Sequence, residues 1–177
     1  MQNAVKALPH YTYDDYLNLE GQWEIIDGIP YAMSPAPIPT HQYVAGAIHS
    51  EFHFALKKCK RCKVFQPIDY KVEDDIILQP DMLVVCGDVK KKFLDFPPQL
   101  VLEILSPATA DKDRFVKYPI YESQRIPYYL IINPDTKETE VYEFENSSYQ
   151  LKQKGKGFTY TFLFAQGCEA TIDFSEI

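Results

Sequence analysis

Two acidic residues lie within segments that are otherwise apolar, and they constrain the fold and chemistry of this chain more than any other feature. Asp81 lies in PDMLVV at positions 80–85, and Glu103 lies in LVLEIL at positions 100–105. Short apolar runs rich in β-branched residues are typical of strands that are covered on both faces. A buried acid is costly unless a partner compensates it. Carboxylates on two such strands can share a cation such as Mg²⁺, which prefers oxygen ligands, so the sequence predicts a metal site.

An alternative interpretation is that each acid ends its strand and faces water, which is the commoner arrangement for a single Asp or Glu. Two acids in matching contexts favour the metal site instead. Asp81 and Glu103 are 22 residues apart (103 − 81). This separation accommodates two strands and a connecting loop, so the two carboxylates can be neighbours on adjacent strands.

The length and composition fit one folded domain that spans residues 1–177. Of the 177 residues, 46% are hydrophobic, which is enough for an ample core. No apolar stretch approaches the roughly 18 residues of a membrane span. The first residues, MQNAVK, lack the apolar segment of a signal peptide. We therefore expect a cytoplasmic protein without a membrane-spanning segment.

The formal net charge of −7 argues against a protein that coats nucleic acid by bulk electrostatics, because phosphate binding needs cations concentrated on one face. Two local basic clusters are nevertheless able to contact a phosphate backbone, although each is explained equally well as a solvated helix end or loop. They consist of Lys57, Lys58, Lys60, Arg61 and Lys63, and of Lys90, Lys91 and Lys92.

The order of the predicted elements is that of a mixed α/β fold. Thr12, a capping-type residue followed by Asp15, predicts a short helix near residues 11–19, and Asp27 with Gly28 predicts the turn of a hairpin. The spacing of apolar residues predicts the other elements. They are an irregular segment at 34–40, a core helix at 41–58, strands at 64–72, 82–86, 100–105, 128–132, 138–144, 149–152 and 170–174, and a helix at 110–123.

The four cysteines are too few for a disulfide scaffold, and only Cys59 and Cys62 have Cys-x-x-Cys spacing. A zinc site would need two further ligands, and the sequence shows no second Cys-x-x-Cys and no His pair that would supply them. We therefore expect free thiols near a helix end. A structural zinc site or a redox role is the alternative. His49 and His53 are four residues apart on the core helix, and without an evident third ligand we expect them at the surface.

Lys117 lies four residues after Asp113 in the second long helix, so the two side chains share a face. An ordinary ion pair on the helix surface is the simpler interpretation. The alternative is that Lys117 reaches the metal site, where its ammonium group could orient water or stabilise developing negative charge. Pro119 is expected to disturb the helix at this point.

In the combination and order of its motifs, the chain resembles the Uma-two family of restriction-endonuclease-like proteins. The resemblance runs from about Tyr11 to Tyr142. That family is part of the PD-(D/E)XK nuclease superfamily, so the resemblance implies a restriction endonuclease-like core with a mixed central β-sheet flanked by helices. The residues that carry it are EIIDG at 24–28, MSPAP at 33–37, His41, Pro80-Asp81, EILSP at 103–107, and Asp113 with Lys117 and Tyr121.

The resemblance also implies roles for individual residues. It makes Asp81 and Glu103 the pair that binds Mg²⁺, which Mn²⁺ can replace. The Lys position of the family's Glu-x-Lys element is Leu105 in this chain, so a catalytic lysine must come from elsewhere, and Lys117 is the candidate. Glu24 would hold the metal or a water bound to it. His41 would carry a proton near neutral pH, although it could equally bond the backbone at the start of its helix.

The function that these residues imply is a Mg²⁺-dependent endonuclease that hydrolyses phosphodiester bonds. DNA is the expected substrate, because the superfamily cuts DNA more often than RNA. A homodimer is expected, since two sites could then face the two strands of a duplex. The main alternative is a non-catalytic nucleic-acid-binding or assembly module that retains the nuclease fold. Hydrolysis of another phosphate ester is a third, weaker alternative.

Overall fold

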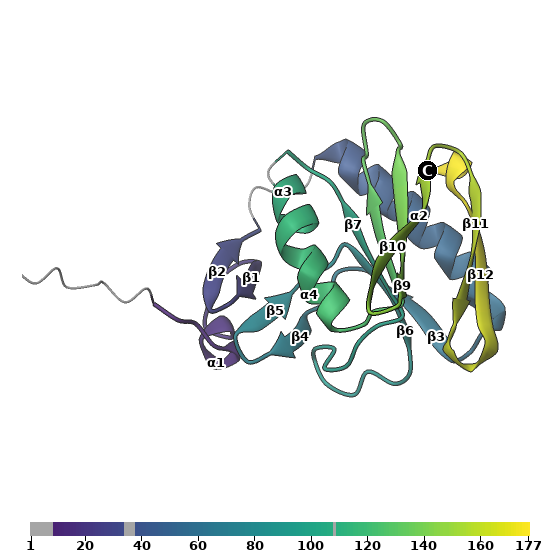
Figure 1. The fold of residues 1–177 in the computed structure, drawn as a ribbon. Coiled ribbons are helices and arrows are strands. Elements are labelled where there is room, and N and C mark those ends of the chain that lie inside the picture. Colours follow the sequence, from purple (N-terminus) through teal and green to yellow (C-terminus); the bar gives the residue numbers. More distant parts are fainter. Residues whose placement is uncertain (1–8, 34–37, 108) are drawn as a thin grey trace, which may run out of the picture.

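The structure is a computed structural model that describes residues 9–33, 38–107 and 109–177 (Figure 1). Its centre is a sheet of six strands in the order β10-β9-β8-β7-β6-β3. The strands are β3 (Cys62–Phe65), β6 (Met82–Cys86), β7 (Leu100–Ile104), β8 (Tyr128–Ile132), β9 (Thr139–Glu145) and β10 (Ser148–Gly155). Strands β7 and β8 are parallel and the other neighbours are antiparallel, so the sheet is mixed, as the sequence predicts.

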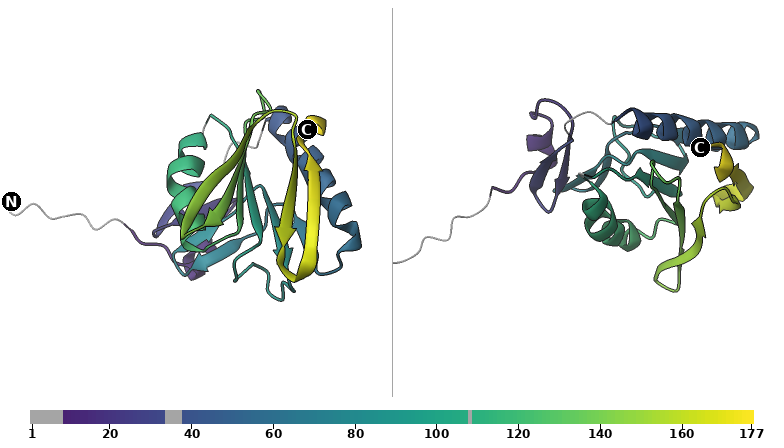
Figure 2. Two further views of the ribbon diagram at one scale, coloured as in Figure 1. Left: turned by 45° about the vertical axis from the view of Figure 1, so that its right-hand side comes forward. Right: turned by 90° about the horizontal axis from the view of Figure 1, so that it is seen from above.

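Helices cover both faces of this sheet. The long helix α2 (Pro39–Ala55) lies along one face, and the helical connection between β7 and β8 lies on the other (Figure 2, right). This connection consists of α3 (Ala110–Lys112), the π-helical turn η2 (Asp113–Lys117) and α4 (Tyr118–Ser123). A parallel pair of strands requires such a crossover, since a tight turn can join only antiparallel strands.

Alternate residues of the central strands enter two separate cores. In β7, Leu100 and Leu102 pack in the core beneath α2, whereas Val101 packs in the core beneath α4. Because side chains on both faces of β6 and β7 are buried, the sequences of these strands are continuously apolar and do not alternate between apolar and polar residues. The core beneath α2 also takes in the last hairpin, formed by β11 (Thr159–Phe164) and β12 (Cys168–Asp173).

A second sheet of four strands, in the order β2-β1-β5-β4, holds the N-terminal part of the described chain. Its strands are β1 (Trp23–Ile26), β2 (Ile29–Ala32), β4 (Tyr70–Glu73) and β5 (Ile76–Leu78). The predicted hairpin is confirmed, because β1 pairs with β2 and the turn residues Asp27 and Gly28 both have positive φ. Helix α1 (Tyr13–Tyr16) precedes the hairpin and begins with the predicted capping box of Thr12 and Asp15.

Several boundaries differ from the prediction. Helix α2 begins at Pro39, inside the segment expected to be irregular, because the first turn of a helix tolerates a residue without a backbone N–H. Of that segment, residues 34–37 lie outside the described residues. The predicted strand at 64–72 is two strands, β3 and β4, in different sheets. Strands β5 and β11 were not predicted; β5 has only three residues and follows two acids.

The expectation of free thiols is wrong. Cys59 is bonded to Cys168, and Cys62 is bonded to Cys86. Sequence spacing could not indicate these pairs, because Cys168 lies 109 residues after Cys59 and reaches it only through the docking of the last hairpin. Among the described residues, no helix is long and apolar enough to cross a membrane.

Candidate active site

A pocket of about 790 Å³ opens where β2, the start of α2, the start of β6, the end of β7 and the helical connection meet. Its rim is largely apolar. The ionisable side chains in its wall include every predicted site residue except Glu24 and Lys117, which lie behind the wall. The ionisable residues that line the pocket are His41, Asp81, Glu103, Asp111, Lys112 and Asp113.

The two predicted acids are neighbours on adjacent strands. Met82 pairs with Leu102 in the antiparallel β6–β7 register, so the same register places Asp81 opposite Glu103. Asp81 Oδ2 accepts a hydrogen bond of 2.7 Å from the backbone N–H of Ile104. The side chain of Asp81 is 18% exposed, whereas Glu103 as a residue is only 2% exposed. Asp81 is therefore the more accessible of the two acids.

Lys117 lies among three carboxylates. Its Nζ is 2.7 Å from Oε1 of Glu24, 3.0 Å from Oε1 of Glu103 and 3.4 Å from Oδ1 of Asp113. Burial lowers the pKa of Lys117, but the charges of Glu103, Glu24 and Asp113 more than offset this, so the pKa is raised well above its usual value. The ammonium group therefore stays charged at every physiological pH.

The wide turn of η2 determines where Lys117 points. Pro119 lacks the N–H that would bond the carbonyl of Phe115 in an α-helix, and its ring would clash there. The helix responds with a π-helical turn from Asp113 to Lys117. Such π-bulges occur often at functional sites. The predicted disturbance by Pro119 is thus confirmed, and both Asp113 and Lys117 point inward and are buried.

Glu24, in β1, is fully buried and both of its carboxylate oxygens are engaged. Oε1 faces Lys117 and also accepts a hydrogen bond of 2.9 Å from the backbone N–H of Gln79. Oε2 is 2.5 Å from Nζ of Lys112. Burial raises the pKa of Glu24, but the two lysines more than offset it, so the pKa is lowered. The predicted metal-binding role of Glu24 stays a prediction, and the contacts present hold the two lysines in place.

Glu103 has the opposite electrostatic balance. Burial raises its pKa well above the usual value, the charge of Lys117 opposes this only in part, and Asp113, Asp81 and Glu24 raise it further. Oε1 also accepts a hydrogen bond of 2.7 Å from the hydroxyl of Tyr121. Glu103 is therefore a carboxyl whose negative charge is only partly compensated by the cation beside it.

His41 contacts Asp81 in the first turn of α2, where Nε2 is 3.3 Å from Asp81 Oδ2. Burial lowers the pKa of His41, but the hydrogen bond and charge of Asp81 more than offset it, so the pKa is raised. The other ring nitrogen, Nδ1, is buried and has no hydrogen-bond partner. The imidazole is thus placed to exchange a proton beside the more accessible acid.

Three residues that contact the predicted site residues were not themselves assigned to the site, although Asp113 and Tyr121 belong to the motifs that carry the resemblance. Lys112 pairs with Glu24, Tyr121 donates to Glu103, and Asp113 contacts Lys117. Asp113 and Tyr121 are each four residues from Lys117, so they lie on the same helix face, and this spacing was the signal that could have added them. Lys112 had no such signal, since five residues separate it from Lys117.

The donor set fits a hard cation bound by few protein ligands. Four acids, Glu24, Asp81, Glu103 and Asp113, surround only two lysines and one histidine. Within the described ranges, however, no three carboxylate oxygens from different residues lie within 4.8 Å of one another. Mg²⁺ commonly binds one or two carboxylates and keeps several waters. Asp81 and Glu103 together meet that requirement without Glu24.

The fold of this chain is shared with a protein of known structure. The chain is similar to the crystal structure of "a putative nuclease belonging to DUF820" from Anabaena variabilis ATCC 29413, with a TM-score of 0.69 and 18% sequence identity. The similarity covers 84% of this chain and 87% of that one, and it shows a shared fold. A comparison with curated proteins found no match.

The sequence itself matches a known family along most of its length. Residues 12–170 match Uma2, which is described as "Putative restriction endonuclease". The family predicted from the motifs and the restriction endonuclease-like fold class are thereby confirmed. This chain belongs to the Uma2 family.

Proposed function

We propose that this protein is a metal-dependent endonuclease that hydrolyses phosphodiester bonds, with DNA as its substrate. The observation that carries the proposal is the excess of buried acids over cations at the wall of the pocket, on a fold shared with a protein described as a nuclease. The family description supports nuclease chemistry in general. A homodimer is part of the proposal, since two sites could act on the two strands of a duplex.

Asp81 and Glu103 are the proposed ligands of Mg²⁺, for which Mn²⁺ can substitute. When bound, a divalent cation polarises the phosphate and lowers the pKa of a water molecule. Asp81, the more exposed acid, is oriented by the N–H of Ile104. Glu103 is oriented by the hydroxyl of Tyr121. Because the pKa of Glu103 is raised, a proton and a cation would compete for this carboxylate.

Lys117 is the proposed replacement for the family's motif lysine. Leu105 stands at the motif position and packs in the apolar core beneath α4. The Lys117 ammonium group reaches Glu103 from the helical connection, and Glu24 holds it there. In the proposal it orients the attacking water or neutralises charge that develops on the phosphate. His41 is the proposed proton carrier, because its Nε2 lies beside Asp81.

The apolar rim of the pocket supports a nucleic acid rather than a small phosphate ester as substrate. Phe115 is 73% exposed, and Tyr31 and Ile38 are also exposed beside the pocket. Aromatic side chains at such a rim can stack on unpaired bases irrespective of sequence. Lys112 lies 5.7 Å from the centre of the Tyr31 ring, which places a cation next to one of these surfaces.

The test is cleavage of supercoiled and single-stranded DNA with Mg²⁺ or Mn²⁺. We expect the wild type to cut, and Asp81→Ala and Glu103→Ala, each shown to be folded, to lose cleavage. Asp74→Ala is the control, because Asp74 is a largely exposed acid in the turn between β4 and β5 and does not line the pocket. Equal activity in all four proteins would reject the site and point to a contaminating nuclease.

A binding or assembly module is the second candidate. The observation that favours it is the burial of Glu24 and Glu103, whose charges are partly met by Lys117 without any metal. Absence of cleavage on DNA and RNA, together with no measurable Mn²⁺ binding, would support this candidate over the nuclease.

A further inference from the structure

The four cysteines lie near the C-terminal end of α2, whereas the pocket contacts the start of this helix. Cys59 follows the 3₁₀ turn η1 (Leu56–Lys58) that ends the core helix, and Cys62 begins β3. Cys86 ends β6 and pairs with Cys62 in the strand register, and Cys168 begins β12. The Cys59–Cys62 segment is thus brought beside two cysteines that are distant from it in the sequence, Cys86 and Cys168.

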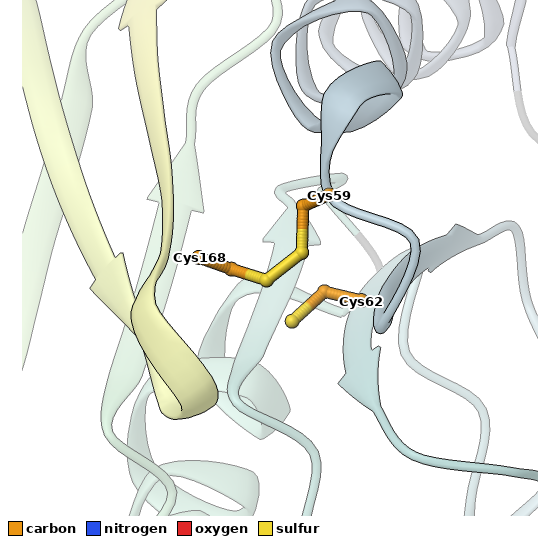
Figure 3. A group of neighbouring side chains, drawn as sticks. All are labelled: Cys59, Cys62 and Cys168. Carbon is orange, nitrogen blue, oxygen red and sulfur yellow. A yellow bond between two sulfur atoms is a disulfide. The ribbon is translucent and has the colours of Figure 1, made fainter.

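The two disulfides of this cluster lie against each other. The sulfur atoms of Cys59, Cys62 and Cys168 are all within 4.8 Å of one another, although Cys62 is not bonded to either of the other two (Figure 3). The sulfur of Cys86 lies outside this group of three but is bonded to that of Cys62. Two independent disulfides have no need to be this close. Four thiolates that share one tetrahedral zinc ion do, because Zn–S bonds of about 2.3 Å bring neighbouring sulfurs to about 3.8 Å.

We propose that the reduced cluster is a zinc site in which Cys59, Cys62, Cys86 and Cys168 are the four ligands. The inference is independent of the proposed nuclease function. Its ligands are soft thiolates, which select Zn²⁺ over Mg²⁺, whereas the pocket offers hard carboxylates. Cys59 and Cys62 also have the Cys-x-x-Cys spacing that is common in structural zinc sites.

The surrounding charge suits such a site. A zinc ion with four thiolates carries a net charge of about −2. The hollow above Cys59 and Cys168 is lined by three cations, Lys58, Lys60 and Arg61, against a single acid, Glu169. This basic cluster, which the proposed function does not use, would compensate the negative zinc–thiolate group. The hollow is open and gives the ion a path to the sulfurs.

The backbone already has the form that the ligands need. The N–H of Cys59 donates to the carbonyl of Leu56, which closes the turn before the Cys-x-x-Cys segment. The N–H of Gly87 donates to the carbonyl of Arg61, which ties that segment to the end of β6. Both bonds are independent of the sulfur oxidation state, so reduction leaves the thiols near one another.

The chemistry balances with a dithiol as the reductant. Each cysteine disulfide accepts two electrons and two protons, and the dithiol is oxidised to a disulfide. The four thiols then bind one Zn²⁺ and release four protons, because the thiolate is the metal ligand. Disulfides are rare where thiols are kept reduced, so the zinc form is the one expected in such a compartment.

The experiment uses the full chain, reduced with dithiothreitol without oxygen, incubated with ZnCl₂ and freed of loose metal by gel filtration. We expect one zinc ion per chain by mass spectrometry of the metal. The four thiols should react with a thiol reagent only after a chelator is added. Substitution with Co²⁺ should give the visible absorption and sulfur-to-metal charge transfer of a tetrahedral thiolate site. These three readings need no variant, so they hold even where a cysteine variant fails to fold.

Variants then assign the ligands. Cys62→Ser and Cys168→Ser should each lose the Co²⁺ charge-transfer band and at least tenfold in zinc affinity. Two matched controls should keep the full zinc content. They are His49→Ala with His53→Ala, which removes the other pair at ligand spacing, and Asp81→Ala, which removes the carboxylate site. Four reactive thiols with no retained zinc in the reduced wild type would overturn the proposal, as would zinc that is lost in either control and kept in the cysteine variants.

Discussion

Glu103 and Glu140 lie at the same level of the six-stranded sheet, yet their surroundings are opposite. Ile131 in β8 pairs with Glu103 on one side and with Glu140 on the other, so the two acids are two strands apart. Arg114 contacts Glu140 through two parallel hydrogen bonds of 2.8 and 2.9 Å. Lys154 and the hydroxyl of Tyr142 also donate to it. Glu140 therefore has two cationic partners, Arg114 and Lys154, for its single negative charge.

Glu103 shares one lysine with two other acids and borders the pocket. The consequence appears in the pKa values. Burial raises the pKa of Glu140, but the hydrogen bonds from Arg114, Tyr142 and Lys154 more than offset it, so the pKa is lowered to about 2. For Glu103 the effect of burial exceeds the opposing effect of the Lys117 charge, so the pKa is raised. A compensated acid stabilises a fold, whereas an undercompensated acid at a pocket is able to bind a cation.

The largest expected difference between the two acids is in catalysis. Glu103→Gln should lower the rate of DNA cleavage about 1,000-fold or more, because loss of a metal ligand removes several kcal/mol of transition-state stabilisation. Glu140→Gln should leave the rate within about twofold, since Glu140 lies outside the pocket wall. Single-turnover cleavage under saturating Mn²⁺ measures both. Comparable losses of cleavage in the two variants would contradict a catalytic role that belongs to Glu103 and not to Glu140.

The cations beside the two acids, Lys117 and Arg114, should differ in how much they stabilise the fold. Lys117→Met leaves buried acids without their cation and should lower the free energy of unfolding by about 3 to 5 kcal/mol. Arg114→Met should lower it by no more than about 1 kcal/mol, because its side chain is about one-third exposed and solvent screens the pair. Urea denaturation at neutral pH with a chelator present measures both values. A larger loss in Arg114→Met would show that Glu140 is the costlier acid to leave unpaired.

The two acids should also give opposite dependences of stability on pH. Because the folded-state pKa of Glu103 is raised, the folded protein binds more protons than the unfolded chain, so its contribution to stability is lost as pH rises through the folded pKa. Glu103→Gln should therefore become more stable relative to wild type as pH rises above about 4.5.

Glu140 has a lowered folded-state pKa, so its contribution is present above the unfolded pKa and is lost as pH falls toward about 2. Glu140→Gln should therefore be less stable than wild type at pH 6, and this difference should shrink in acid. Denaturation curves at a series of pH values, without metal, report both trends. Parallel curves for the two variants would contradict the assigned pKa directions.

The smallest expected effects come from the two tyrosines that donate to these acids. Tyr121→Phe removes the 2.7 Å hydrogen bond to Glu103 and should weaken Mn²⁺ binding about tenfold, as the loss of a group that orients a metal ligand commonly does. Tyr142→Phe removes the 2.6 Å bond to Glu140 and should leave Mn²⁺ binding unchanged. Calorimetric titration separates the two variants. Equal Mn²⁺ affinity in both would remove Tyr121 from the site.

Much of this fold could be predicted from the sequence, because the local signals for individual strands, turns and caps are strong. The apolar runs of β6 and β7, the Asp27-Gly28 turn and the capping box of α1 each determine their structure with few residues. The pairing of Asp81 with Glu103 followed from strand adjacency alone. Contacts between residues that are distant in the chain could not be predicted from the sequence. The docking of β12 beside Cys59, the salt bridge of Lys112 to Glu24 and the difference between Glu103 and Glu140 all depend on tertiary packing.

The most direct test of the central comparison is diffraction from crystals grown with Mn²⁺, using its anomalous scattering. We expect a peak in the pocket beside the carboxylates of Asp81 and Glu103, and no peak beside Glu140. The pocket peak should be absent from crystals of Glu103→Gln. Crystals grown with Mn²⁺ that show no peak in the pocket, with Lys117 still in contact with Glu103, would contradict the assignment of this site as a metal centre.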